Sequence, residues 1–288
     1  MWEEQRRLIR QGNEILRVSD GARAYCSDFQ GRQVALFIHG FTANASCMTP
    51  LMTQFAGNGF AALAFNYACF NGIDVAAQSL AELLQRLDDL GNGAIAQNRI
   101  VVVGHSMGGL VARALIALYA GHRYVRKVIT LGTPNDGTLT EPRYLEYLLA
   151  WSEAISGLVA GGYSPKCRTA MQLIGRDGPE FLLAHLKTIA VPCNTVDFHS
   201  ISGGRAVLEF GRGGYASRAA NTWIQFQLGG LANDGLVAEA SSNLGQSMFA
   251  TCAPGCIHSN SYAEYPNVNH SHLVSNFNVA LQTLQMAR

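Results

Sequence analysis

One serine stands between two glycines in the motif Gly-His-Ser-Met-Gly at residues 104–108. An apolar run at residues 100–103 precedes the motif, and a pattern typical of an amphipathic helix follows it. A tight turn from a buried strand into a helix strains the serine backbone and exposes its hydroxyl, while the helix N-terminus directs free N–H groups toward it. We therefore interpret Ser106 as a candidate nucleophile. The alternative is an ordinary serine in a glycine turn.

A serine nucleophile needs a general base and a group that orients this base. When the serine sits on such a turn, the partners follow in the order acid, then histidine. Asp234 lies in an Asn-Asp-Gly turn late in the chain, whereas its rival Asp197 lies inside an alternating apolar run. His270 and His272 both stand just before the last predicted helix, and His270 lies further into the loop. We predict Asp234 and His270 as the acid and the base, with His272 as the alternative base.

Acyl transfer also needs two backbone N–H donors for the oxyanion that develops on the substrate carbonyl. One donor is expected from Met107, the residue after the nucleophile. The other is expected from Phe41. An early apolar strand runs into the sequence His39-Gly40-Phe41, and Phe41 begins the loop after this strand. His39 precedes the serine in the chain, so we interpret it as structural.

The chemistry of such a site requires no metal and no organic cofactor. Cys252 and Cys256 lie close to His258, but a zinc site would need a second ligand pair at similar spacing. We expect either plain thiols or a local disulfide there. The seven cysteines are an odd number, so at least one thiol is free.

The elements that position these residues alternate between strands and helices. Strands that read as continuous apolar runs and are separated by helices indicate a parallel sheet that is covered on both faces. The fold class is therefore α/β, as one domain over residues 1–288. Strands are expected at residues 33–40, 60–67, 100–103, 127–131, 194–203 and 247–253, and helices at residues 49–59, 73–90, 109–120 and 272–286.

Residues 138–190 interrupt this alternation with a predicted helical insertion that resembles a lid. Tyr144, Tyr147 and Trp151 in this stretch are consistent either with a wall for an apolar substrate or with packing of the insertion onto the sheet. Residues 1–21 read as a short charged amphipathic helix without the apolar core of a signal peptide. The expected location is cytoplasmic or that of a mature secreted form.

Composition excludes several classes of function. Hydrophobic residues make up 48% of the 288 residues and charged residues 14%, as expected for a chain that buries a large core. The net charge is +1 with scattered basic residues, so the clustered basic face of a nucleic-acid-binding protein is not expected. No apolar run reaches the roughly 18 residues that a membrane span needs.

The motifs Phe-Ile-His-Gly-Phe, Gly-His-Ser-Met-Gly-Gly, Leu-Gly-Thr-Pro, Asn-Asp-Gly-Leu-Val and Val-Asn-His occur in this order over residues 34–273. This series resembles the α/β-hydrolase superfamily, in particular bacterial triacylglycerol lipases and esterases. The resemblance implies an α/β-hydrolase fold with Ser106, Asp234 and His270 as the triad, and with Phe41 and Met107 as oxyanion donors. It departs at Asn135, where a histidine is common, and residues 253–267 read as an extra loop between the acid and the base.

The resemblance also implies a function. The expected activity is that of a serine carboxylester hydrolase acting on small-molecule or lipid esters, with transient contact with a lipid surface. An acyltransferase, a thioesterase or a phospholipase would use the same triad, and a hydrolase fold used only for binding is a further alternative. Some lipases of this kind carry a structural calcium, but no carboxylate cluster is visible here to hold one.

Overall fold

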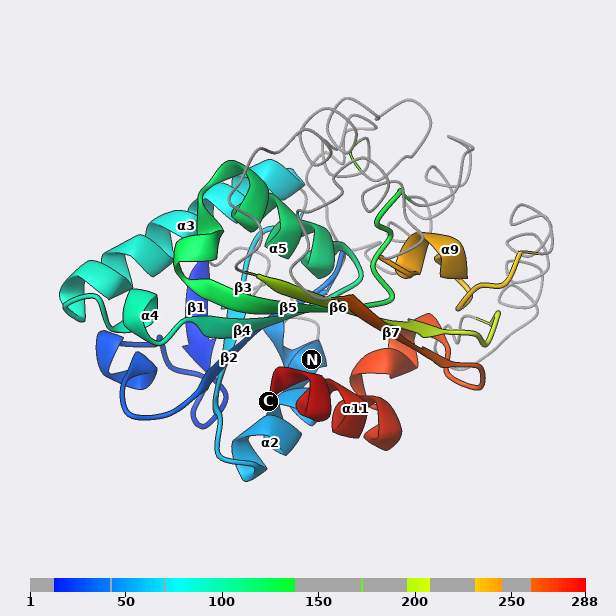
Figure 1. Cartoon of the computed structure of the whole chain (residues 1–288), viewed down its shortest axis with the longest axis horizontal. Coiled ribbons are helices and arrows are strands. Elements are labelled where there is room, and N and C mark those ends of the chain that lie inside the picture. Colours follow the sequence, from blue (N-terminus) through cyan, green and yellow to red (C-terminus); the bar gives the residue numbers. More distant parts are fainter. Residues whose placement is uncertain are drawn as a thin grey trace, which may run out of the picture.

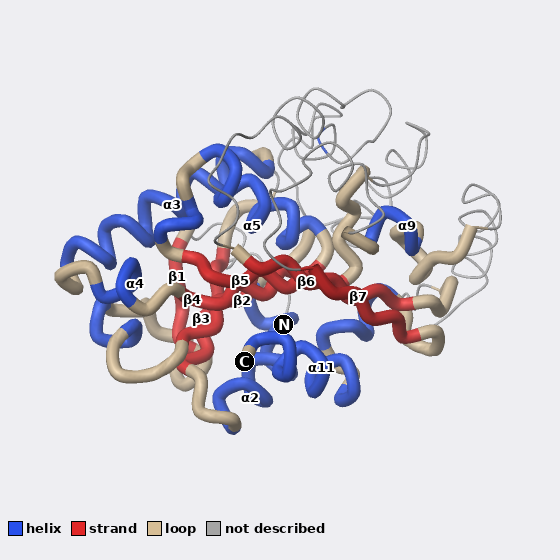
Figure 2. The backbone as a smooth tube through the Cα atoms, viewed as in Figure 1, coloured by secondary structure: helices blue, strands red, loops and turns tan. Residues whose placement is uncertain are grey.

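One seven-stranded sheet organises the described part of the chain, in the order β1-β3-β2-β4-β5-β6-β7 (Figures 1 and 2). The computed structural model describes residues 13–41, 43–69, 71–137, 172, 196–207, 231–244 and 260–288. Strands β2 to β7 run parallel, and β1 pairs antiparallel with β3 at one edge. The strands are β1 (Glu14–Arg17), β2 (Val34–Ile38), β3 (Ala61–Asn66), β4 (Ile100–His105), β5 (Val125–Leu131), β6 (Asp197–Gly203) and β7 (Asn260–Tyr265).

The central strands are buried on both faces, which explains their continuous apolar sequences. Every residue of β2, β3 and β4 is buried, and β5 has only Arg126 partly exposed. Apolar side chains that alternate between the two faces therefore supply two separate cores. The sheet is the shared wall between them.

Helices cover both faces of the sheet, as the alternating sequence predicts. In Figure 1, α3 and α5 lie on one face, and α2 and α11 lie on the other. Helix α3 buries a stripe of apolar residues spaced three or four positions apart, which includes Ala76, Leu80 and Leu84. The helices are α2 (Thr49–Gly57), α3 (Ile73–Leu90), α4 (Ala94–Gln97), α5 (Met107–Leu118), α9 (Glu239–Ser242) and α11 (Phe277–Ala287). Short 3₁₀ helices are η1 (Cys26–Phe29), η2 (Ala45–Met48), η3 (Gly121–Arg123) and η6 (His270–Val274).

Parallel strands place their carboxyl ends at one edge of the sheet, and the candidate site residues follow these ends. Ser106 comes directly after β4, and residues 39–41 come directly after β2. The loop with Asp234 lies between β6 and β7, and His270 opens η6 five residues after β7. The topology alone therefore gathers four distant segments at one edge.

Two segments that were not predicted as strands are strands, and the last helix begins later than predicted. Residues 14–17 form strand β1 rather than part of a helix, because Ile15 is buried against the sheet and the segment pairs with β3. The segment predicted as an extra loop at residues 253–267 contains β7, whose polar sequence fits its place at the edge of the described sheet, where it pairs with β6. The last helix begins at Phe277, where the Asn276 side chain caps it by accepting from two backbone N–H groups.

Several predicted features lie outside the described residues. The strand predicted at residues 247–253 and the end of the predicted N-terminal helix toward residue 1 are among them. The insertion predicted at residues 138–190 is described only at Gln172. This side chain is buried, and it accepts a hydrogen bond from the Ile73 N–H (2.6 Å) and donates to Asp74 (2.8 Å) at the start of α3. None of the described helices is both long enough and apolar enough to cross a bilayer.

Candidate active site

Ser106 occupies the turn from β4 into α5 in a strained backbone conformation. Its φ is 53° and its ψ is −126°, a region that non-glycine residues rarely adopt. The backbone is held there by three hydrogen bonds: the Ser106 N–H donates to the Leu131 carbonyl (2.8 Å), and the Ser106 carbonyl accepts from the Gly109 N–H (3.1 Å) and the Thr133 hydroxyl (2.9 Å). Strain of this kind costs on the order of 1–3 kcal/mol and persists only where the surroundings fix it.

The glycines around Ser106 are required by space. A Cβ on Gly104 would lie 2.5 Å from the Gly109 nitrogen, so strand and helix could not approach as they do. A Cβ on Gly108 would overlap the Ile38 carbonyl at the end of β2, and one on Gly109 would overlap the Thr133 side chain. The glycine pattern predicted from the sequence thus reflects close packing of α5 on β2, β4 and the loop after β5.

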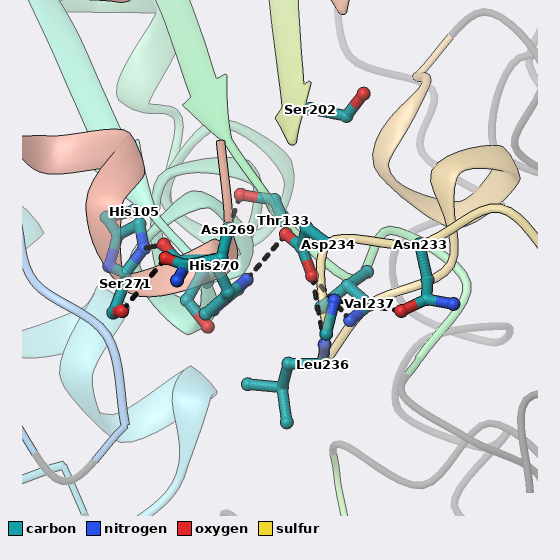
Figure 3. Close-up of polar contacts among 12 residues, drawn as sticks. His105, Thr133, Ser202, Asn233, Asp234, Leu236, Val237, Asn269, His270 and Ser271 are labelled. Carbon is teal, nitrogen blue, oxygen red and sulfur yellow. Dashed lines mark hydrogen bonds and ion pairs between the residues drawn. The ribbon is translucent and has the colours of Figure 1, made fainter. Parts of the chain in front are cut away.

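Asp234 and His270 form a buried, hydrogen-bonded pair. The His270 Nδ1 lies 2.7 Å from the Asp234 Oδ2, and Figure 3 shows the two side chains directed at each other. The His270 N–H also donates to the Asp234 carbonyl (2.8 Å), so backbone and side chain are held together. The other carboxylate oxygen accepts from the Leu236 N–H (3.1 Å) and the Val237 N–H (2.8 Å). Asp234 is fully buried, and these bonds satisfy its charge without solvent.

This geometry determines the tautomer of the neutral His270 ring. A carboxylate only accepts, so the Nδ1 carries the proton, and the Nε2 of the neutral ring is an acceptor. The Nε2 is buried and has no hydrogen-bond partner among the described residues. It is therefore the free basic nitrogen of a ring that Asp234 holds in a fixed tautomer.

His105 links the nucleophile turn to the histidine. It is the last residue of β4, and its Nε2 donates to the His270 carbonyl at 3.0 Å (Figure 3). The two imidazole rings also pack with their centroids 4.9 Å apart. Burial, together with the nearby His270, lowers the pKa of His105 to about 3, so His105 remains neutral. The residue next to Ser106 thus holds the backbone of His270.

The end of β5 is the second link between Ser106 and the Asp234–His270 pair. Leu131 and Thr133 bind the Ser106 backbone, and Gly132 between them lies against the pair. A Cβ on Gly132 would lie 2.8 Å from the Asp234 Oδ2 and 3.0 Å from the His270 Nδ1, and its φ is +57°. Glycine is needed here both for the turn and for the close approach.

The loop after β2 reaches the nucleophile, as an oxyanion site would require. A Cβ on Gly40 would lie 2.9 Å from the Ser106 Cβ, so the backbone next to Phe41 passes directly beside the serine. Met107 opens α5, where backbone N–H groups have no intrahelical acceptor. The predicted donors Phe41 and Met107 thus lie on the two segments that flank Ser106.

The rival residues lie elsewhere or carry other contacts. Asp197 begins β6 opposite Lys127, at the amino edge of the sheet, far from the nucleophile turn. His272 is exposed. His39 is fully buried, and its Nδ1 donates to the Gly40 carbonyl (2.9 Å) while its ring stacks on Tyr67. Burial lowers the pKa of His39 to about 4, which suits the structural role expected from the sequence.

Sequence reasoning did not assign roles to His105, Gly132 or Thr133, although all three lie in motifs it quoted. The signal for the last two was a Gly-Thr-Pro turn directly after a buried strand. Asn135, which replaces a common histidine, binds the buried Arg113: the guanidinium donates to the Asn135 carbonyl (3.0 Å) and to its side-chain oxygen (2.9 Å). This contact fixes the turn after β5 onto α5.

The possible metal and disulfide residues Cys252, Cys256 and His258 lie outside the described residues. Within the described ranges, no group of three or more His, Cys, Asp or Glu residues is placed to hold a metal ion. Cys26 and Cys47, two of the cysteines in those ranges, are free thiols.

Comparison with known proteins gives a family match and a set of similar folds. A family model described as "Alpha/beta hydrolase family" matches residues 35–256. The mature form of Bacillus licheniformis lipase BlEst2 is similar with a TM-score of 0.63 and 16% identity, over 90% of this chain and 94% of that chain. The metagenomic carboxyl esterase MGS0156 has a TM-score of 0.58 and 17% identity, over 90% of this chain and 74% of that one. No curated protein matches the chain by sequence.

A eukaryotic structure shares the same fold. A soluble variant of monoglyceride lipase from Saccharomyces cerevisiae is similar with a TM-score of 0.54 and 12% identity, over 94% of this chain and 87% of that chain. At these identities the similarity shows a common architecture.

The packing of the nucleophile turn predicts opposite effects for two glycine-to-alanine substitutions in helices. Gly108→Ala places a methyl group against the Ile38 carbonyl and should destabilise the protein by about 2 kcal/mol or more. Gly57→Ala in α2 meets no atom within 4 Å and should be neutral or stabilising by up to about 1 kcal/mol. Urea unfolding of both variants measures this difference, and equal effects would contradict the packing described.

The two buried neutral histidines predict a loss of stability in mild acid. Burial lowers the pKa of His39 to about 4 and that of His105 to about 3, whereas an unfolded histidine titrates near 6.5. As pH falls below about 6.5, the unfolded chain binds protons that the folded chain does not, so the folded state is progressively destabilised. Each ring should cost about 2 kcal/mol between pH 7 and pH 5.

Urea unfolding of the wild type, His39→Asn and His272→Asn at pH 7 and pH 5 checks this expectation. Although His39→Asn is expected to be less stable at pH 7, its stability should change less between the two pH values than that of the wild type. Substitution of the exposed His272 should leave the pH dependence as in the wild type. A wild type equally stable at both pH values would refute the assignment of neutral buried rings.

Proposed function

This chain belongs to the alpha/beta hydrolase family, and we propose that it is a serine carboxylester hydrolase, a lipase or esterase that cleaves acyl esters through a covalent acyl-enzyme. The observation that carries the proposal is the 2.7 Å contact between Asp234 and His270, beside the strained turn of Ser106. It leaves a buried basic nitrogen, the His270 Nε2, without a partner in the described structure. A catalytic base has such a nitrogen without a partner when no substrate is bound.

In the proposed mechanism, the Ser106 Oγ attacks the ester carbonyl carbon while the His270 Nε2 takes the hydroxyl proton. The Asp234 carboxylate keeps the Nδ1 proton in place and stabilises the imidazolium that forms. The carbonyl oxygen becomes an oxyanion that accepts hydrogen bonds from the Phe41 and Met107 backbone N–H groups. The imidazolium then gives its proton to the leaving alcohol, and the acyl group stays on Ser106.

Deacylation repeats the same steps with water as the nucleophile. His270 takes a proton from water, which attacks the acyl carbon, and a second oxyanion forms at the same two N–H groups. Its collapse releases the carboxylic acid and returns the proton to the Ser106 Oγ. Every proton moves through one nitrogen, so the position of the ring relative to Ser106 controls both halves of the reaction.

The similar structures favour an ester as the substrate. Their titles describe a lipase, a carboxyl esterase and a monoglyceride lipase. An acyltransferase or thioesterase would use the same triad and would differ only in the acceptor or in the scissile bond. Comparison of p-nitrophenyl oxyesters with matched thioesters separates an esterase from a thioesterase.

The proposal predicts that Ser106→Ala abolishes turnover of p-nitrophenyl esters, tested from acetate to palmitate. Removal of the nucleophile should lower kcat by about 10⁴-fold or more, because the remaining groups act only through it. Retention of most activity in this variant would contradict the proposal. The chain length with the highest kcat/KM distinguishes an esterase from a lipase.

The two neighbouring histidines provide a matched pair for the base. His270→Asn should lose activity by about 10³-fold or more, since the general base and its bond to Asp234 disappear. His272→Asn, two residues away and exposed, should retain activity within about twofold. Activity that depends on His272 and not on His270 would show that the proposed base is wrong.

A further inference from the structure

A cavity lies at the edge of the sheet opposite the candidate active site. Its volume is about 640 Å³, and it is lined where β2, β4 and β5 begin. Ser106 follows the other end of β4, so the length of this six-residue strand, roughly 20 Å, separates the two sites. The triad does not use this cavity.

The charged side chains that line the cavity are all positive. Three of the eight lining residues are arginines, and none is acidic. Three more carry side-chain amides, which can donate hydrogen bonds, and the remaining two have no polar side chain. The arginines are Arg32, Arg99 and Arg126, and the amides are Gln33, Gln97 and Asn98.

Two of the arginines are held in place by the fold. Arg126 lies in β5 and donates from Nη2 to the Ala287 carbonyl at the end of α11 (2.9 Å). Arg99 precedes β4 and donates from Nη1 to the His122 carbonyl (3.4 Å). A guanidinium has five N–H donors, so the single bond of Arg126 leaves most of its donors for another acceptor. Arg32 is exposed at the rim of the cavity.

The pKa of Arg126 depends on the charged groups beside it. Burial lowers the pKa of Arg126, Asp197 opposes this effect, and the nearby Arg99 adds to the lowering. Asp197 therefore offsets part of the charge at Arg126 without lining the cavity. The chain as a whole has a net charge of only +1, so three guanidiniums around one cavity are a local excess of positive charge. An anion bound between them would relieve this repulsion.

We propose that this cavity binds a soluble small molecule that carries a phosphate group with at least two negative charges. Arginine recognises phosphate oxygens through paired N–H donors, and the amides of Gln33, Gln97 and Asn98 supply neutral donors around them. A volume of about 640 Å³ is larger than a bare phosphate needs and is in the range of small-ligand sites. The charged and amide side chains of the lining favour a polar ligand over an apolar one.

Titration calorimetry with inorganic pyrophosphate at low ionic strength tests this proposal on the whole chain. The wild type should bind, and the affinity should fall as salt is added. Arg32→Gln, at an exposed position, should weaken binding by about tenfold, and the double variant with Arg99→Gln should weaken it further. Arg86→Gln, at an exposed position on α3, is the matched control and should bind like the wild type.

Three results would overturn the proposal. The first is a wild type that does not bind pyrophosphate. The second is a double variant that binds pyrophosphate as well as the wild type does, once its thermal unfolding shows that it is folded. The third is Arg32- and Arg99-dependent binding to vesicles of phosphatidic acid in phosphatidylcholine without binding of pyrophosphate, which would assign the cavity to a lipid headgroup. None of these results depends on ester hydrolysis, so they are independent of the proposed function.

Discussion

The geometry of the site depends on the contacts of three residues, Leu131 at the end of β5 and the following Gly132 and Thr133. Leu131 and Thr133 bind the backbone of Ser106 from both sides of the strained turn, and Gly132 between them lies against Asp234 and His270. One short segment therefore sets the position of the nucleophile turn and of the acid–base pair. The segment continues from β5, an interior strand that is buried between the two cores of the sheet.

The second constraint is that the histidine is held at three points. Asp234 binds its Nδ1 and its backbone N–H, and His105 binds its carbonyl. The ring nitrogen that faces away from the acid is left as an acceptor, which a general base must have. The neutral state of His105, caused by burial, avoids placing a second positive charge beside an imidazolium that forms during catalysis.

The sequence predicted the local parts of this arrangement well. The nucleophile turn, helix α3 and the central apolar strands follow from residue type and spacing over short distances, and the family and the mainly parallel sheet are confirmed. The edge strands β1 and β7 were missed because their mixed polar and apolar sequences become strands only through pairing with a neighbour. Such pairing is a long-range effect that local patterns do not contain.

The chemical roles of Ser106, Asp234 and His270 stay predictions, and one labelling experiment tests them most directly. A fluorophosphonate probe, located by mass spectrometry of the digested protein, reports whether Ser106 is a nucleophile activated by His270. The account predicts rapid modification of Ser106 in the wild type and in His272→Asn, and a loss of labelling by about 10³-fold or more in His270→Asn. Labelling of a different serine, or modification of Ser106 at an unchanged rate in His270→Asn, would contradict it.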